Sequence, residues 1–200
     1  KGGALSLAET TTLIEWETIG LLLGMMIMVG IMAHTGIFEW FAVQAYKQSK
    51  GNVWSLVVIL CVVTAILSAF LDNVTTMLLL TPVTIQLARV LDLNPIPILI
   101  SEVIFSNIGG TATMIGDPPN IIIGSTMSES AIAGNDKAEI AALASEGVTF
   151  TDFIIELAPG VLLTAVPCLM MVKWMYASEF AGERIRDVKE LEAKYGFKDV

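Results

Sequence analysis

The chain alternates between long apolar runs and short polar interruptions. The longest apolar runs are of a length that lets an α-helix enter or cross the hydrocarbon core of a bilayer. This pattern predicts an all-α membrane protein, a helical bundle in which the polar interruptions face protein or water rather than lipid. The four longest runs are Thr18–Ala33, Val53–Leu71, Met77–Val90 and Phe153–Tyr176.

A polar cluster separates the second of these runs from the third. Residues 72–76 (DNVTT) lie between Val53–Leu71 and Met77–Val90, which predicts a helical hairpin with a polar tip. The hairpin could cross the bilayer fully, or it could be re-entrant with its tip near the middle of the membrane. Only the re-entrant form would bring the tip to the second polar interruption of the chain.

The second interruption, Ser106–Ser125 (SNIGGTATMIGDPPNIIIGS), is poorly suited to a continuous helix. Gly109 and Gly110 loosen the backbone, and Pro118 and Pro119 donate no backbone hydrogen bond. Irregular backbone at membrane depth is tolerated only where protein or a water-filled cavity covers it. The stretch therefore predicts a broken transmembrane helix.

Polar and amphipathic segments connect the apolar runs. Residues 36–50 alternate aromatic and polar side chains at helical spacing, which predicts a helix in the membrane surface with Trp40 and Tyr46 as anchors. Residues 125–149 read as a hydrophilic loop with a single lysine, whereas the other basic clusters fall on the opposite side of the predicted membrane. The positive-inside rule then places the N-terminus and this loop outside, and the C-terminal tail in the cytoplasm.

The composition agrees with a membrane location and excludes several functions. Of the 200 residues, 54% are hydrophobic and 16% are charged, whereas globular domains usually carry about 25% charged residues. The net charge is −9 and no basic stripe is present, which excludes nucleic acid as a partner. The sequence contains no phosphate-binding loop, dinucleotide fingerprint, nucleophile elbow or His/Glu metal pair. We therefore expect neither an enzyme nor a bound cofactor.

Two carboxylates, Asp72 and Asp117, lie inside the polar interruptions. An ionised aspartate at the bilayer centre costs about 2.5–3.5 kcal/mol on insertion scales, so each needs a partner or a wet cavity. A proton and a metal ion can compete for such a group, which is the minimal chemistry of antiport. Neighbouring neutral oxygens, unwound carbonyls at the glycine pair and the positive end of a half-helix after Pro119 would complete an ion site. The candidate ion-binding or substrate-binding residues are Asp72, Asn73, Thr75, Thr76, Ser106, Asn107, Gly109, Gly110, Thr111, Thr113, Asp117 and Asn120, with Asp72, Asn73, Ser106, Asn107 and Gly110 as the candidate Na⁺ ligands.

Structural roles are open for several of these residues. Asp72 and Asn73 are good helix caps and could do no more than begin the second arm of the hairpin. Asp117 could simply form a turn before the two prolines. Glu102, one helical turn before the second interruption, is a weaker candidate that could be either buried or interfacial.

Two long strings in these elements closely resemble a known family. SAFLDNVTTMLLLTPVT (Ser68–Thr84) and EVIFSNIGGTATMIGDPPN (Glu102–Asn120) are similar to permeases of the P-protein (pink-eyed dilution) type. WETIGLLLGMM (Trp16–Met26) extends the resemblance, which covers roughly residues 15–125. This type is related to the arsenite permeases and NhaD-type sodium/proton antiporters of the ion transporter superfamily, whose domain is often called citrate-transporter-like.

The resemblance implies that a re-entrant hairpin and an unwound helix meet their inverted counterparts from a second repeat. Residues 72–76 would be the hairpin tip, and Ser106–Asn120 the unwound segment. Only one copy of each is present, so we expect residues 1–176 to be a partial first repeat and residues 177–200 a cytoplasmic connector toward a second. Dicarboxylate-carrying relatives tend to have Ser-Asn-Thr at the tip and Gly-Thr-Pro-Pro-Asn at the turn. The added carboxylates here favour cation or proton coupling.

Our first hypothesis is a multi-pass secondary ion transporter that works by alternating access, with Na⁺ and/or H⁺ as coupling ions and Na⁺/H⁺ antiport as its activity. Within the same class, the alternative is transport of an anion (chloride, arsenite or a carboxylate) coupled to Na⁺ or H⁺. From another class, the alternative is a membrane scaffold that has kept the fold without transport. The expected partners are a small inorganic ion, the lipid bilayer, the second repeat of the same polypeptide and, as a further option, a second copy in a homodimer.

Overall fold

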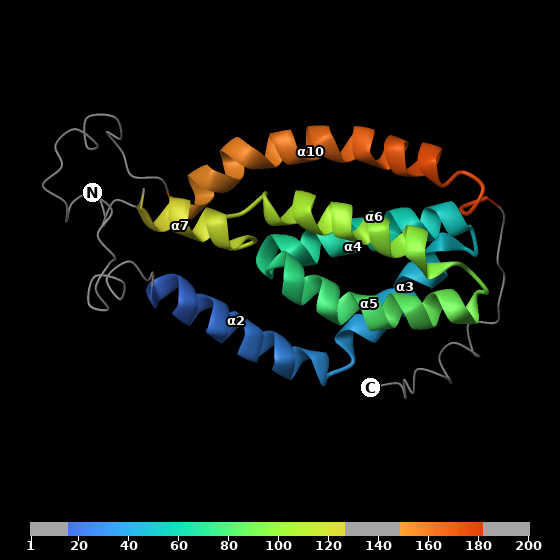
Figure 1. The fold of residues 1–200 in the computed structure, drawn as a ribbon, viewed down its shortest axis with the longest axis horizontal. Helices are drawn as coiled ribbons and strands as arrows, with labels where there is room; N and C mark the ends of the chain where they lie inside the picture. The colour runs from blue at the N-terminus through green and yellow to red at the C-terminus, as the bar shows by residue number, and fades with distance from the viewer. Residues whose placement is uncertain (1–15, 127–148, 182–200) are drawn as a thin grey trace, which may run out of the picture.

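The computed structural model describes residues 16–126 and 149–181, and every regular element in these ranges is a helix (Figure 1). The predicted all-α class is therefore confirmed for the described part of the chain. Most of the expected loop at 125–149 and of the connector at 177–200 lies outside the described residues, as do residues 1–15. The helices are α2 (Trp16–Ala33), α3 (Ile37–Ser49), α4 (Val53–Phe70), α5 (Asn73–Val90), α6 (Pro95–Gly110), α7 (Pro118–Thr126) and α10 (Phe150–Met175).

Polar side chains determine where four of these helices begin. Asn52, Asp72 and Asn94 each accept a hydrogen bond from a backbone N–H in the first turn of α4, α5 and α6, at 2.9, 2.9 and 3.2 Å. Thr149 and Asp152 form a reciprocal capping box at the start of α10. Such caps satisfy N–H groups that have no partner inside the helix, and each contributes about 1 kcal/mol.

The polar cluster at the hairpin tip is helical rather than irregular. α5 begins at Asn73, before the start expected at Met77, because Asp72 caps its first turn. Residues 73–76 therefore belong to the second arm, and the turn of the hairpin is confined to Leu71 and Asp72. The predicted hairpin is present with a tighter tip than expected.

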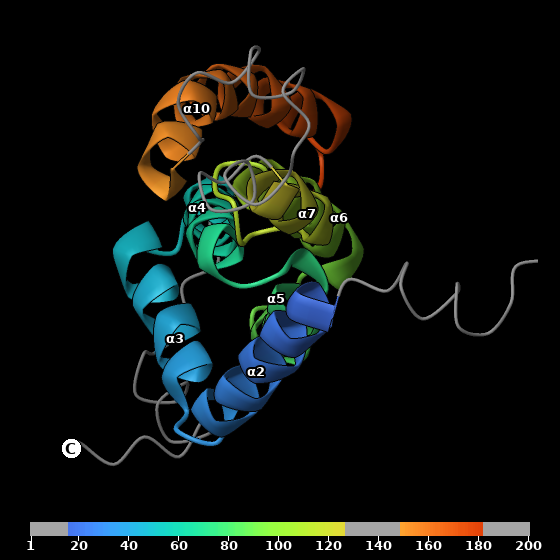
Figure 2. The ribbon, with the colours of Figure 1, turned by 90° about the vertical axis from the view of Figure 1, so that its left-hand side faces the viewer.

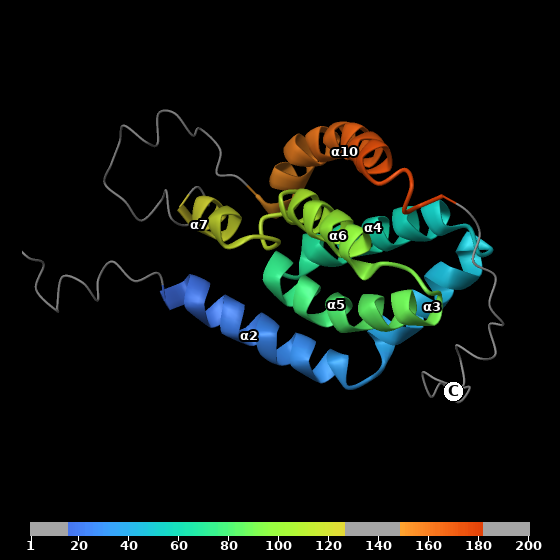
Figure 3. The same ribbon diagram turned by 45° about the vertical axis from the view of Figure 1, so that its right-hand side comes forward.

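α4, α5 and α6 form the centre of the bundle. α4 packs most extensively against α6, and α5 packs against both of them. α10 covers the α4–α6 pair on one side, while α2 lies on the opposite side beside α5 (Figures 2 and 3). α3 packs against α4 and α5. This arrangement covers the two long arms of the hairpin and leaves the tip next to the break between α6 and α7.

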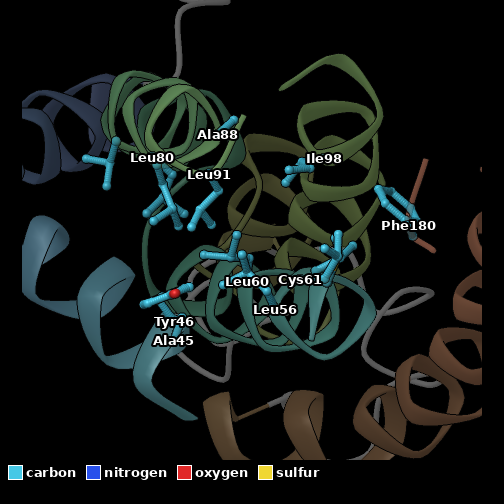
Figure 4. Close-up of a cluster of buried hydrophobic side chains, with 14 of the residues drawn as sticks. Ala45, Tyr46, Leu56, Leu60, Cys61, Leu80, Ala88, Leu91, Ile98 and Phe180 are labelled. Atoms are coloured by element: carbon cyan, nitrogen blue, oxygen red, sulfur yellow. The ribbon is translucent and has the colours of Figure 1, made fainter. Parts of the chain in front are cut away.

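A buried apolar cluster holds the central helices together (Figure 4). Leu56 of α4, Leu80 of α5 and Ile98 of α6 are each at most 3% exposed, and burying one such side chain contributes about 1.5–3 kcal/mol. Tyr46 of α3 joins this cluster at 3% exposure, so the prediction that it is an interfacial anchor is wrong. Trp40 is 47% exposed, and its anchoring role stays a prediction.

Apolar side chains are exposed on the outer helices. On α10, Leu162, Leu163 and Trp174 are 70%, 78% and 81% exposed, a pattern that soluble monomers rarely show. Among the described helices, α4 and α10 are long and apolar enough to cross a membrane by length and composition. α10 stays continuous through Pro159 and Pro167 and arches over the bundle (Figure 1).

Candidate ion-binding site

The broken helix is present, but its irregular part is shorter than expected. α6 continues through Gly110, and α7 begins at Pro118, so only residues 111–117 are non-helical. Ser106–Gly110 are helical, and the expectation of unwound backbone at the glycine pair is wrong. The pair lies in the last helical turn of α6, where packing against neighbouring helices outweighs the intrinsic cost of glycine in a helix.

The hairpin tip and the broken helix lie side by side (Figure 1). Asn73 Nδ2 donates to Asn107 Oδ1 at 3.0 Å, and Ser106 Oγ donates to the Asn73 carbonyl at 3.3 Å. The Thr113 hydroxyl donates to the carbonyl of Ala69. These hydrogen bonds join positions 33 to 44 residues apart, and they bring together the two interruptions that the sequence singled out.

Ser68 of α4 also belongs to this junction, and the sequence reasoning missed it. Its Oγ lies 3.3 Å from the Oγ of Ser106, and both side chains are fully buried. The feature of the sequence that could have indicated this role is a serine inside an apolar run, just before the hairpin tip. A lone serine is also compatible with a bond to its own helix, as Thr64 makes to the Leu60 carbonyl at 2.8 Å.

Hydrogen bonds inside the break fix its shape. Asn120 Nδ2 donates to the carbonyls of Gly110 and Thr113 at 3.1 and 2.9 Å, and the Gly116 N–H donates to Thr113 Oγ1 at 3.1 Å. One acceptor position of the Gly110 carbonyl, a candidate Na⁺ ligand, is therefore occupied. The side-chain amide of Asn120 therefore stabilises the conformation of the non-helical segment.

The exposed Thr111 takes no part in these cross-helix bonds. Its hydroxyl donates to the Ile108 carbonyl in its own helix at 2.8 Å. Its backbone N–H donates to the Asn107 carbonyl at 3.2 Å, also within α6, so the bonds of Thr111 do not reach the hairpin tip.

Each of the two interruptions contributes one carboxylate to this part of the molecule. Asp72 is 7% exposed, and its oxygens accept from the backbone N–H and the hydroxyl of Thr75. The Asp117 carboxylate lies against Gly110, where a Cβ atom would stand 2.8 Å from Asp117 Oδ2. The carboxylates are near enough for their charges to repel, an arrangement that a bound cation stabilises. The capping role of Asp72 is confirmed, and its role as an ion ligand stays a prediction.

Thr76 has an unsatisfied polar atom. Its side chain is 1% exposed, and its Oγ1 has no hydrogen-bond partner in the described part of the chain. A buried hydroxyl without a partner costs about 1–3 kcal/mol, so a ligand or water that reaches this oxygen would be stabilised.

The start of α7 offers few backbone donors. Pro118 and Pro119 have no N–H, and the N–H groups of Asn120 and Ile121 both donate to the Asp117 carbonyl, at 3.0 and 3.3 Å. Anions bind helix N-termini through free N–H groups as well as through the helix dipole. The start of α7 therefore carries the expected positive helix dipole but lacks the free N–H groups that would bind an anion.

An open groove of about 620 Å³ borders the junction. Asn73, Ser106 and Asn107 line it with polar groups, whereas its walls from α5 and α6 are mostly apolar. In residues 16–126 and 149–181, no three His, Cys, Asp or Glu side chains gather as a metal-binding group. Any cation here would be held by neutral oxygens and by no more than two carboxylates. The other lining residues are Val74, Met77, Leu78, Thr81, Pro82, Ile85 and Val103.

The fold and the site define an all-α membrane protein in which a polar hairpin tip meets a broken helix. The family described as "Citrate transporter" matches residues 2–194, and the chain belongs to this family of membrane transport proteins. This membership agrees with the expectation that the chain is not an enzyme.

Individual relatives confirm the resemblance to the P-protein type. The chain is 46% identical over 171 residues to the P protein of Homo sapiens, covering 86% of this chain and 19% of that protein. It is 48% identical over 172 residues to the P protein of Mus musculus, covering 84% and 19%. An uncharacterized transporter of Mycobacterium tuberculosis (strain CDC 1551 / Oshkosh) is 40% identical over 187 residues, covering 93% and 39%. The chain thus spans 19% of the length of the P proteins and 39% of the length of the mycobacterial transporter.

Proposed function

We propose that this chain forms the first repeat of a multi-pass secondary transporter that exchanges Na⁺ for H⁺ by alternating access. The observation that carries the proposal is the pair of carboxylates, Asp72 and Asp117, which the two interruptions supply to one junction. A cation between them would relieve their mutual repulsion. Neutral oxygens of Asn73, Ser106 and Asn107 lie at the same junction, and hard cations favour such ligands.

The start of α7 favours a cation over an anion at this site. A citrate-like substrate would need hydrogen-bond donors where Pro118 and Pro119 supply none, and it would meet the carboxylate of Asp117. Desolvating an anion beside this carboxylate is costly. These features support Na⁺ at the junction itself.

The second candidate function is transport of an anion with Na⁺ as the co-ion. The description of the matching family, "Citrate transporter", favours it. In this case Na⁺ would still bind at the tip, and the anion would lie in the groove beside Asn73 and Asn107, whose amide groups can donate. The two candidates differ in whether Na⁺ movement is coupled to protons or to an anion.

The proposed partner of this chain is a second repeat of the same polypeptide. The relatives are much longer than this chain, and the groove on α5 and α6 opens to the outside of the described part of the bundle. We propose that the second repeat faces this groove. Gly20 and Gly24 of α2 have open space where a Cβ would stand, which supports close approach of another helix there, including one from a second copy.

The proposal is tested by Asp72→Asn in the full-length protein, reconstituted in liposomes with a Na⁺ gradient. Asparagine caps a helix as well as aspartate does, so the substitution removes the charge and keeps the start of α5. Losing a charged contact costs about 1.5–3 kcal/mol, which predicts a roughly tenfold to hundredfold weaker apparent Na⁺ affinity. Na⁺ uptake and internal pH are measured together.

Asp92→Asn is the matched control. Asp92 is an exposed aspartate in the turn between α5 and α6, and asparagine tolerates its positive φ of 54°. We expect this variant to transport like the wild type. If Asp72→Asn exchanges Na⁺ for H⁺ with unchanged Na⁺ affinity, the proposed site is wrong. Uptake of Na⁺ that requires an anion and leaves the internal pH unchanged would select the second candidate.

A further inference from the structure

Besides Asp72 at the hairpin tip, the bundle contains another buried carboxyl group, in the middle of α6. Glu102 of α6 is fully buried in the bundle, and its Oε1 accepts a hydrogen bond from the Thr84 hydroxyl of α5 at 2.8 Å. Its Oε2 is also buried and has no hydrogen-bond partner in the described part of the chain. Thr84 itself is 2% exposed. The candidate ion site uses neither residue.

The surroundings of this carboxyl contain few groups that could balance a charge. α4 carries no charged residue. Its buried Cys61 is a titratable group that interacts electrostatically with Glu102. On α5 the charged residue is the exposed Arg89 in the last turn. α10 also packs against α6, and its charged residues Asp152, Glu156 and Lys173 are all exposed.

A buried carboxylate with one hydrogen bond and no cation beside it is unstable. The group is therefore stable at this place either as the neutral acid or with a cation nearby. Glu102 lies one helical turn before the part of α6 that forms the ion-binding junction. At that separation, in a medium of low dielectric constant, a charge on one group strongly changes the affinity of the other site for an ion.

We propose that Glu102 is the proton-carrying residue of the transport cycle, an inference that rests on the proposed Na⁺/H⁺ exchange. The carboxylate takes a proton from water on one side of the membrane while the tip holds no Na⁺. After the change of access, Na⁺ binding at the tip stabilises the deprotonated form of Glu102, and the carboxylic acid releases its proton to water on the other side. One proton is bound and released per cycle, and Thr84 holds the carboxyl in place in both states.

The test compares Glu102→Gln with wild type in the full-length protein. Glutamine keeps an acceptor for Thr84 and similar volume but releases no proton. We expect Na⁺-dependent H⁺ flux in proteoliposomes to fall at least tenfold, while Na⁺ still raises the melting temperature of the purified variant. Glu179→Gln, an exposed position after α10, is the matched control and should behave like the wild type in both measurements.

Infrared spectroscopy supplies a readout that does not depend on transport. Adding Na⁺ to the wild type should remove an absorbance band of a protonated carboxyl group, and Glu102→Gln should lack this change. Thr84→Val removes the hydroxyl and keeps the carboxyl, so it should retain proton exchange with an altered pH dependence, which Thr84→Ser should restore. If Glu102→Gln fails to fold, Glu102→Asp must shift the frequency of the band.

Flux measurements on the wild type and on Glu102→Gln separate the role of Glu102 from the exchange activity itself. A wild-type protein that moves Na⁺ without moving protons overturns the exchange proposal and, with it, the role of Glu102. A wild-type protein that exchanges normally, with Glu102→Gln exchanging at the same rate, overturns only the role of Glu102. An unchanged carboxyl band in Glu102→Gln or Glu102→Asp does the same.

Discussion

Single side chains shape the junction by bonding to the backbone of another segment. Thr113 is the clearest case, because its hydroxyl donates to the Ala69 carbonyl of α4 and accepts from the Gly116 N–H inside the break. The side chain is 4% exposed, so water does not replace either bond. Thr113 thus fixes the irregular segment to the hairpin.

Replacing Thr113 by valine should loosen this attachment. Valine has nearly the same shape but leaves a carbonyl and an N–H without a partner, which costs about 1–3 kcal/mol of unfolding free energy. Thr113→Ser keeps the hydroxyl and loses one methyl group, at a cost of about 0.8 kcal/mol. Denaturant unfolding of the full-length protein in detergent checks both values. Equal losses in the two variants would mean that the hydroxyl bonds do not stabilise the break.

Most residues of the junction could be identified from the sequence, whereas the hydrogen bonds between them could not. Asp72 as a cap and Asn73 and Asn107 as polar groups inside apolar helices were recognisable, because each departs from its local pattern. Ser68 was not recognised because a serine can bond to its own helix equally well. The bond between Glu102 and Thr84 depends on how α5 and α6 pack, and no local pattern encodes that.

Among the elements, α4 and α6 approach each other closely at Gly109. A Cβ atom at this position would overlap the backbone of Ala65, which cannot move as a flexible side chain can. The approach lies next to the last turn of α6, so it also sets how near Ser106 comes to Ser68. Glycine is required here for helix packing rather than for an unusual backbone angle.

Gly109→Ala should therefore push α4 and α6 apart. Overpacking of this kind costs about 1–3 kcal/mol, and we expect a lower melting temperature in detergent together with weaker Na⁺ transport. Gly30→Ala is the control, because the structure leaves open space at that position in α2. Alanine in an exposed helix is favoured over glycine by about 0.5–1 kcal/mol. A melting temperature for Gly109→Ala at or above that of Gly30→Ala would contradict the close approach.

The existence of each element was predictable, and the element boundaries were less so. The hairpin and the broken helix were visible because polar residues, glycines and prolines interrupt apolar runs. The boundaries moved because Asp72 caps α5 early and because α6 continues through Gly109 and Gly110. Both shifts come from tertiary packing and capping, which override the local preference of individual residues.

For the whole molecule, basic residues mark one end of the bundle. Lys173 lies over the ring of Trp54 at 5.3 Å, which joins the end of α10 to the start of α4. Lys50 is the C-cap of α3 and lies in the turn before α4. The 26 residues of α10 span about 39 Å, which exceeds the hydrocarbon thickness of a bilayer. The two ends of α10 should therefore emerge on opposite sides.

Cysteine labelling checks this orientation. In a variant of the full-length protein without its native cysteines, Lys50→Cys and Lys173→Cys should react with a membrane-impermeant thiol reagent from the cytoplasmic side, as the positive-inside rule requires. Phe150→Cys, at the other end of α10, should react only from the opposite side. Labelling of Lys173→Cys and Phe150→Cys from the same side would exclude a spanning α10.

The arch of α10 has a consequence for what surrounds it. Pro159 and Pro167 have no N–H, so the carbonyls of Ile155 and Leu163 lose the donor that the residue four positions later normally provides. Hydrocarbon cannot replace these donors, and each bare carbonyl would cost several kcal/mol there. Water, a polar side chain or a neighbouring polypeptide should therefore reach both points of the arch, and we expect this flank of the molecule not to face acyl chains alone.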